Sequence, residues 1–326
     1  MIEVLTGSTL NTIQDFGRSR AMTLAVARGG AMDRLALAQG NLLLGNAPGD
    51  AGIEVVFFPF RIRFDAPTAL AITGAEGLAT LDGRVLPANW AITAQPGQVL
   101  TVQAPSSGSR RYLTFGGGLD VPVVLGARAT DVKGNFGGFH GRPLQKGDIL
   151  ATLPVSAAGI RFPEYGYGLS HPAPLPGGTE TVVRVLPAAE HHLFTPESLR
   201  IFEDSTWTLT SSANRMGYRL EGDTPMALHH RVSLFSHGIM PGTVQVPPAG
   251  QPIIQMMDAN TCGGYPKIAT VIEPDLRLLG QTPVGRAVRF VTVSRDEAVT
   301  AIRREATELA ALERDLRTLR AGLLCA

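Results

Sequence analysis

The sequence ATLDGRVLPANWAITAQPGQVLTVQAP, residues 79–105, alternates short apolar runs with turn-forming pairs of residues. The pairs are Asp82-Gly83 and Pro96-Gly97, and an Asp-Gly pair between two apolar runs is a strong local signal for a β-hairpin. A further apolar run, ALAITGA at 69–75, comes shortly before this stretch. This part of the chain is therefore predicted to form short β-strands joined by tight turns.

Glycine recurs before apolar runs in three places along the chain. Gly97, Gly147 and Gly285 precede the runs QVLTV, DILATL and RAVRFVTV. Successive corners of a barrel need residues that adopt positive φ, and glycine does so without steric strain. The 37 glycines and 23 prolines are spread over the whole chain, which favours many short strands over a helical bundle. We predict a mainly β fold with some helix.

Two stretches have the apolar spacing of helices. Residues 32–46, MDRLALAQGNLLLGN, place Asp33 in the first turn and end in a Gly-Asn pair. Residues 294–324 begin with Ser294 and Glu297 at the spacing of a capping box. This C-terminal stretch also carries four leucines on one face, at positions 309, 312, 316 and 319. We expect it to form one long helix that packs on its own body or builds a homodimer.

Composition along the chain divides it into four parts. Residues 156–180 belong to a stretch rich in Pro, Gly and Ser without periodicity, so we interpret them as a linker or excursion. Sequence typical of β-strands precedes and follows this stretch. The predicted domains are a first β-rich subdomain at 1–155, a second at 181–295 and a helical tail at 296–326.

The overall composition excludes several classes of protein. The net charge is +1 and no basic block occurs, so we expect no nucleic-acid partner. The two cysteines, Cys262 and Cys325, lie far apart, which argues against a disulfide framework and against a zinc site. No signal peptide and no apolar run of about 18 residues are visible, so we expect no membrane association and a cytoplasmic location.

Candidate binding residues lie mainly in the second half of the chain. Arg215 and Arg219 can clamp a carboxylate or phosphate, although a pair of surface salt bridges is the alternative. Gln245 and Asp258 lie at the ends of apolar strands, a position suited to orienting a small amide or lactam. Asp33 follows a glycine pair at a helix start and is a further candidate for substrate binding, with a tight entry turn as the alternative role of that pair.

Other kinds of site lack the residues that they need. The sequence has no P-loop lysine and no GxSxG serine motif. The histidines at 191–192 and 229–230 are adjacent pairs whose side chains diverge, so we expect no metal site. Cys262 has no recognisable base to activate its thiol. The glycine-rich residues 128–148 form an irregular loop that approaches a ligand or another chain, or packs on itself.

Six motifs resemble one known family in their order and spacing. They are TIQDFGR (12–18), GGAMDRLALAQGNLLLGN (29–46), YLTFGGGLDVPVVLGARATD (112–131), GNFGGFHGRPLQKGD (134–148), NRMGYRLEG (214–222) and PGTVQVPPAGQPIIQMMDANTCGGYPKIATVI (241–272). These motifs are similar to those of the biotin-dependent carboxyltransferase A/B subdomain family. The resemblance covers about residues 1–295 and leaves the C-terminal helix outside it.

This resemblance implies two β-barrel-like subdomains, the second cyclophilin-like. Family members include the C subunit of bacterial 5-oxoprolinase, allophanate hydrolase subunit 2, KipA-like regulators and the urea amidolyase-related urea carboxylases. The implied partners are a protein with the C/D subdomains (the B subunit of 5-oxoprolinase, or a KipI-like protein) and a third partner, the A subunit. The implied activity is ATP-dependent cleavage of 5-oxo-L-proline to L-glutamate, with ATP bound through partner subunits and no activity of this chain alone.

The same resemblance leaves two alternatives open. One is carboxyl transfer from carboxybiotin to urea or a related amide, which requires biotin, and the other is a non-enzymatic regulatory binding role. The resemblance assigns Arg215 and Gln245 to carbonyl or carboxylate binding, and Asp258 and Tyr265 to orientation or proton transfer. The sequence reads GGAMD, GARATD, ANRMGYR and TCGGYP where SGAMD, GSRSTD, SDRMGYR and TTGGYP are common in the family. Because most of these changes remove polar groups, the regulatory role stays open.

Overall fold

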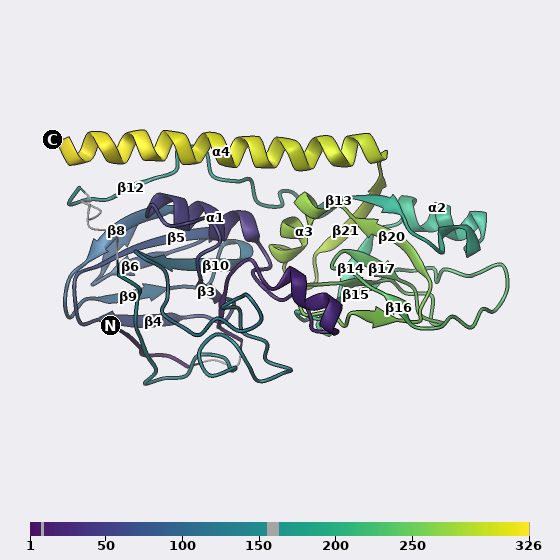
Figure 1. Cartoon of the computed structure of the whole chain (residues 1–326). Helices are drawn as coiled ribbons and strands as arrows, with labels where there is room; N and C mark the ends of the chain where they lie inside the picture. The colour runs from purple at the N-terminus through teal and green to yellow at the C-terminus, as the bar shows by residue number, and fades with distance from the viewer. Residues whose placement is uncertain (8–9, 155–162, 326) are drawn as a thin grey trace. The chain divides into compact units, whose positions relative to one another are not determined.

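The computed structural model describes residues 1–7, 10–154 and 163–325, which form two compact units. Unit 1 contains Met1–Arg18, Gly29–Leu175 and Thr307–Ala326, and unit 2 contains Ser19–Arg28 and Pro176–Ala306. The predicted mainly β fold is confirmed, because unit 1 contains two six-stranded sheets and unit 2 contains a closed barrel (Figure 1). Among the described residues, no helix is both long enough and apolar enough to cross a membrane.

The strands of the predicted hairpin region are divided between the two sheets of unit 1, with β6, β7 and β9 in one sheet and β8 in the other. The first sheet has the order β11-β1-β4-β9-β6-β7, formed by Ile149–Leu150, Ile2–Val4, Phe60–Phe64, Val99–Val102, Ala79–Leu81 and Arg84–Leu86. The second has the order β12-β8-β5-β10-β3-β2, formed by Tyr167–Gly168, Trp90–Ala94, Thr68–Glu76, Ser107–Phe115, Gly52–Val55 and Thr12–Gln14. All strand pairs in both sheets are antiparallel.

The turns predicted from glycine are present. Asp82 and Gly83 have φ of 47° and 81° and join β6 to β7, as expected for a tight hairpin turn. The glycines at 97, 147 and 285 have φ of 85°, 91° and 83°, and each lies two residues before a strand. Glycine is favoured at these corners because side chains are strained at positive φ.

Alternation along the strands places the core of unit 1 between its sheets. In β4, Phe60, Ile62 and Phe64 are buried while Arg61 and Arg63 are exposed. Successive side chains of a strand point to opposite faces, so this pattern gives β4 one apolar face and one solvent face. The apolar face joins a core cluster to which strands of both sheets contribute.

Helix α1, Arg34–Leu43, is the first predicted helix, and it packs on β5 and β10. The Asp33 carboxylate caps it by accepting a hydrogen bond from the Ala36 N–H at 3.0 Å. The second predicted helix is the single helix α4, Arg295–Cys325. Within unit 1, its leucines at 309, 312 and 316 pack on the cluster around Leu42, Leu43 and Leu44. The tail helix therefore packs on its own body here, and its homodimer role stays a prediction.

The barrel of unit 2 has seven strands. Their order is β13-β20-β17-β18-β15-β14-β21, formed by Glu180–Pro187, Lys267–Val271, Thr243–Gln245, Ile253–Gln255, Gly217–Glu221, Trp207–Leu209 and Ala287–Thr292. β13 and β21 pair in parallel and the other neighbours are antiparallel. Trp207 is buried, and Phe202 of α2 (Pro196–Asp204) stacks on Phe290 of β21 with ring centroids 4.3 Å apart.

Short elements complete both units. Unit 2 contains α2 (Pro196–Asp204), α3 (Glu273–Gly280) and a two-stranded sheet of β16 (His237–Gly238) and β19 (Cys262–Gly263). Part of the predicted linker, residues 156–162, lies outside the described residues. After it, β12 pairs with β8 of unit 1, while the chain from Pro176 belongs to unit 2. The domain boundaries proposed above stay predictions.

Candidate functional site

Polar side chains of unit 2 gather where β17 ends and β20 begins. Gln245 and Lys267 are register partners on these strands, and both are buried. The Gln245 side-chain oxygen accepts a hydrogen bond from Gln255 Nε2 at 2.9 Å, and its Nε2 donates to the Tyr265 carbonyl at 3.3 Å. Gly263 approaches this amide closely, because a Cβ there would lie 2.9 Å from Gln245 Nε2 and 2.4 Å from Ile239 Cδ1. The Gln245 amide is therefore held in one orientation.

Three ionisable side chains, Glu190, His237 and Lys267, meet beside this amide, and we call them the ionisable cluster. Lys267 Nζ contacts His237 Nε2, and the same imidazole nitrogen lies 3.1 Å from Glu190 Oε1. The second Glu190 oxygen lies 3.9 Å from Lys267 Nζ, and it accepts a hydrogen bond from the backbone N–H of Lys267 at 3.1 Å. Glu190 therefore binds the backbone at the start of β20, and its carboxylate lies close to the side chains of both His237 and Lys267.

The hydrogen bonds limit how protons are arranged in the ionisable cluster. His237 Nδ1 lies 3.0 Å from the Phe235 carbonyl, which only accepts, so Nδ1 carries a proton. Two arrangements are then possible for Nε2. Either its lone pair accepts a hydrogen bond from the Lys267 ammonium, or Nε2 carries a second proton and donates to Glu190 while Lys267 is neutral. Two cations in contact repel each other, so this contact disfavours protonation of both bases at once.

Burial favours the neutral form of Lys267. Desolvation lowers the pKa of its ammonium, while the nearby Glu190 and Cys262 act in the opposite direction. Cys262 is an exposed free cysteine. A lysine with a lowered pKa beside a histidine is a typical site of proton transfer. Among the described residues, no group of three or more His, Cys, Asp or Glu is placed to hold a metal ion.

Two predicted site residues, Arg215 and Asp258, pair with each other. Arg215 Nε lies 2.8 Å from Asp258 Oδ2, and Nη2 lies 2.9 Å from Oδ1, which is a bidentate ion pair. The Asp258 N–H also donates to the Arg215 carbonyl at 2.9 Å. The pair therefore joins the start of β15 to the loop after β18. The Arg215 guanidinium binds a carboxylate of its own chain in this structure, and its role toward substrate stays a prediction.

The remaining predicted residues lie in different settings. Arg219 is exposed on β15, and the Tyr265 side chain is 48% exposed beside the Gln245 amide. Asp33 belongs to unit 1, where it is buried and caps α1. Arg215, Arg219, Gln245, Asp258 and Tyr265 all belong to unit 2. The substrate roles proposed for these residues and for Asp33 stay predictions.

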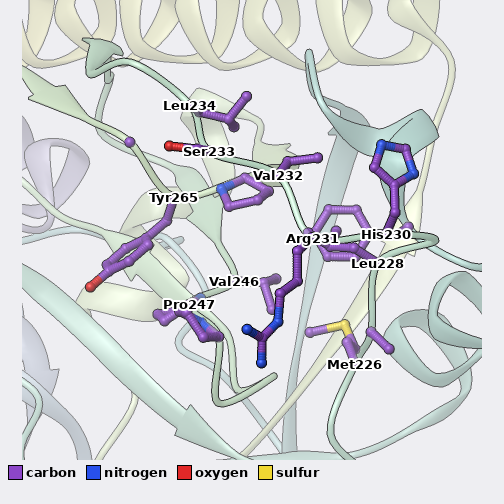
Figure 2. A pocket seen from close by; sticks show the side chains of 15 residues that line it. Met226, Leu228, His230, Arg231, Val232, Ser233, Leu234, Val246, Pro247 and Tyr265 are labelled. Atoms are coloured by element: carbon purple, nitrogen blue, oxygen red, sulfur yellow. The ribbon is translucent and has the colours of Figure 1, made fainter.

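Unit 2 contains a pocket of about 730 Å³, which is lined in part by Tyr265 and by sequence neighbours of Gln245 and Lys267 (Figure 2). Its walls are largely apolar and come from Phe194 and the segments 226–234, 246–248 and 264–266. The pocket shares its segments with the polar residues, because Val246 follows Gln245 and Pro266 precedes Lys267. The volume is in the range of pockets for small molecules.

Sequence reasoning did not single out Glu190, His237 or Lys267. One local signal was available, because Lys267 is the first residue of the apolar strand KIATV and a charged side chain there is unusual if it faces inward. Glu190 and His237 carry no such signal, since they come from the turn after β13 and from the short strand β16. Their meeting depends on the pairing of β16 with β19 and on closure of the barrel.

Several known proteins are similar to this chain in sequence and in fold. Residues 24–292 match the family described as carboxyltransferase domain, subdomain A and B. The chain is 38% identical over 306 residues to the C subunit of 5-oxoprolinase from Escherichia coli (strain K12), and the match covers 92% of this chain and 94% of that protein. It is 40% identical over 298 residues to the 5-oxoprolinase C subunit of Haemophilus influenzae (strain ATCC 51907 / DSM 11121 / KW20 / Rd), with 91% and 93% covered.

A solved structure is also similar to this chain. The crystal structure of the K. lactis urea amidolyase superimposes with a TM-score of 0.86 at 25% identity, and the match covers 95% of this chain and 20% of that chain. The family match spans most of the chain, and the two 5-oxoprolinase relatives are matched over nearly their whole length. This chain therefore belongs to the family of carboxyltransferase domains with subdomains A and B.

Proposed function

We propose that this chain is the C subunit of a 5-oxoprolinase, an enzyme that opens the cyclic amide of 5-oxo-L-proline to give L-glutamate with the use of ATP. The observation that carries the proposal is the identity of 38% and 40% to two proteins of that name, over 94% and 93% of their length. The name describes one subunit of a larger enzyme, which implies a complex of several chains. We expect the partners to be a B subunit with the C/D subdomains and an A subunit, and ATP to be bound through them.

The chemistry of the site agrees with this activity. 5-Oxoproline presents an amide carbonyl, an amide N–H and a carboxylate. In the proposed reaction, the neutral base of the Lys267–His237 pair takes the proton of the amide N–H, and the electron pair of that bond moves toward the carbonyl oxygen. The oxygen is then a better nucleophile toward the terminal phosphoryl group of ATP, and ADP leaves as the new O–P bond forms. Water then adds to the activated carbon, phosphate leaves, and the ring C–N bond breaks as the nitrogen takes a proton. Glu190 stabilises the cation that results from the proton transfer.

Carboxyl transfer to urea is the second candidate. Its support is the similarity to the K. lactis urea amidolyase, and urea also presents an N–H next to a carbonyl. This similarity covers only 20% of the urea amidolyase chain, whereas the 5-oxoprolinase relatives are matched nearly end to end. We therefore favour the lactam as the substrate.

The decisive experiment is reconstitution. The chain is purified together with the A and B subunits, and glutamate release from 5-oxoproline is measured with and without ATP. We expect glutamate only when all three chains and ATP are present, and omission of this chain is the control. Absence of glutamate from the complete complex contradicts the proposal, and transfer of a carboxyl group to urea by a carboxybiotin-loaded partner supports the second candidate.

A further inference from the structure

The pocket of unit 2 combines an apolar wall with one cationic side chain. Met226, Leu228, Val246 and Pro247 line it, and Arg231 enters it from the segment that runs toward His237. Figure 2 shows the Arg231 side chain extending along the pocket toward Val246, Pro247 and Met226. An apolar pocket with few polar groups is a typical binding site for a small molecule, in which the polar groups fix the orientation.

Arg231 differs from two other arginines of unit 2. Arg215 and Arg184 each form a bidentate ion pair, with Asp258 and Asp275 respectively. No ion pair or hydrogen bond of the Arg231 guanidinium is present within residues 1–7, 10–154 and 163–325. A guanidinium presents a planar fork of donors that matches a carboxylate, so an unoccupied one at a pocket favours an anionic ligand.

The pocket is lined by close sequence neighbours of the ionisable cluster, although Glu190, His237 and Lys267 do not line it themselves. Tyr265 lines the pocket, and its carbonyl accepts the hydrogen bond from Gln245. Pro266 lines the pocket as well and directly precedes Lys267. On the other side, the segment that carries Arg231 continues to Phe235, whose carbonyl lies 3.0 Å from His237 Nδ1. A ligand in the pocket is therefore bordered by the same two segments that hold the proton-transfer residues.

We propose that this pocket binds the carboxylate of a small cyclic amide acid through Arg231, and that Arg231 thereby selects such a substrate over an uncharged amide. The ring carbons of the ligand face the apolar wall, and its carboxylate receives two N–H donors from the guanidinium. Urea has no carboxylate, so it gains nothing from Arg231. The proposal rests on the proposed 5-oxoprolinase function, because it assigns the part of the substrate that this chain recognises.

A binding experiment on the purified chain tests the proposal without catalysis. Binding of 5-oxoproline is compared with binding of 2-pyrrolidinone, the same lactam without the carboxylate, by ligand-observed NMR or calorimetry. We expect the wild-type chain to bind 5-oxoproline at least about tenfold more tightly, because hydrogen bonds to charged groups contribute this much. The substitution Arg231→Gln should abolish the difference, and Arg231→Lys should restore part of it.

Arg200→Gln is the matched control, because Arg200 is an exposed arginine of unit 2 on α2 and does not line the pocket. It should leave the preference for 5-oxoproline unchanged. A thermal melt of each variant checks that it is folded. Equal preference for the carboxylate in the wild-type chain and in Arg231→Gln overturns the proposal, and so does equal loss in Arg200→Gln.

Kinetics of the complete complex separate this proposal from the proposed function. With Arg231→Gln, the KM for 5-oxoproline should rise at least about tenfold while kcat changes less, as expected when binding of the unreacting carboxylate is lost. If the wild-type complex releases glutamate and Arg231→Gln has the same KM, the function stands and the Arg231 assignment is wrong. If the wild-type complex forms no glutamate, the function is wrong. If neither the complex nor the chain binds 5-oxoproline, the Arg231 assignment is wrong too.

Discussion

Unit 1 and unit 2 each contain a group of ionisable side chains, and the two groups differ in how they are connected. In unit 1, the buried Glu54 accepts hydrogen bonds from the Tyr112 hydroxyl at 2.7 Å and from the Met32 N–H at 2.8 Å. The same hydroxyl oxygen accepts from the Asp33 N–H at 2.7 Å. Burial and the nearby Glu54 and Asp33 carboxylates raise the pKa of Tyr112 well above its usual value, so it stays a donor.

The ionisable cluster of unit 2 has no such fixed arrangement. His237 Nε2 contacts both Lys267 Nζ and the Glu190 carboxylate, and the His237 side chain is 41% exposed. The comparison separates two uses of buried polar groups. A network in which each donor meets an acceptor stabilises one structure, while neighbouring bases in contact with one carboxylate are suited to chemistry.

The largest effect on stability is expected from Glu54→Leu. The substitution leaves the Met32 N–H and the Tyr112 hydroxyl without their acceptor in a buried site. Each unsatisfied buried donor destabilises by about 1–3 kcal/mol, so the free energy of unfolding should fall by about 3 kcal/mol or more. Urea denaturation of the purified chain measures the change.

Glu76→Leu is the control for this prediction, because Glu76 is an exposed carboxylate at the end of β5 in the same unit. It should change the free energy of unfolding by less than about 0.5 kcal/mol. A similarly small change in Glu54→Leu would show that the network of unit 1 does not stabilise the fold, and the comparison with unit 2 would fail.

The next largest effect is expected from Lys267→Met, and it should appear in activity. Loss of one base of the Lys267–His237 pair should lower glutamate formation by the complete complex about 100-fold. A thermal melt of the variant must show that it is folded, because Glu190 loses one of its two basic partners. Lys146→Met is the control, since Lys146 is an exposed lysine in the turn before β11. Full turnover by Lys267→Met excludes the proposed role.

The pH dependence of stability gives a second measurement on Lys267. Burial lowers the pKa of Lys267 in the folded chain below its usual value of 10.5. The unfolded chain then binds the proton more tightly, so Lys267 opposes folding below its folded pKa. This opposition disappears as the pH rises through the folded pKa toward 10.5. The wild-type chain should therefore gain stability relative to Lys267→Met over this alkaline range.

The sequence predicts local features of the fold because short-range interactions determine them. The Asp82-Gly83 turn follows from two residues that tolerate positive φ. The Ser294–Glu297 capping box follows from a spacing of three residues at the start of α4. The division of the chain into units is different in kind, because Ser19–Arg28 belongs to unit 2 although its neighbours in sequence belong to unit 1. No local pattern contains that information.

The candidate site was only partly predictable for the same reason. Arg215 and Asp258 were singled out by residue type, but their pairing spans 43 residues and depends on strand register. His237 contacts Lys267 across 30 residues and Glu190 across 47 residues. These contacts between residues far apart in sequence depend on the pairing of β16 with β19 and of β13 with β20. A single sequence shows the members of such a cluster but not that they meet.

The smallest effect is expected from Glu297→Gln, which isolates burial as the difference between two otherwise similar carboxylates. Like Glu54, Glu297 accepts from a backbone N–H and a hydroxyl, here the Ser294 N–H at 2.8 Å and the Ser294 Oγ at 2.7 Å. Glu297 is exposed, so water replaces these partners readily, and the midpoint of thermal unfolding at pH 7 should fall by only about one or two degrees.

The hydrogen bonds from Ser294 lower the pKa of Glu297 below its usual value of 4.5. Its contribution is therefore complete above pH 4.5 and is lost as the pH falls through the folded pKa. The melting temperatures of wild type and Glu297→Gln should converge once the pH lies below the folded pKa, and a difference that persists there would show that the amide acts through something other than the lost charge.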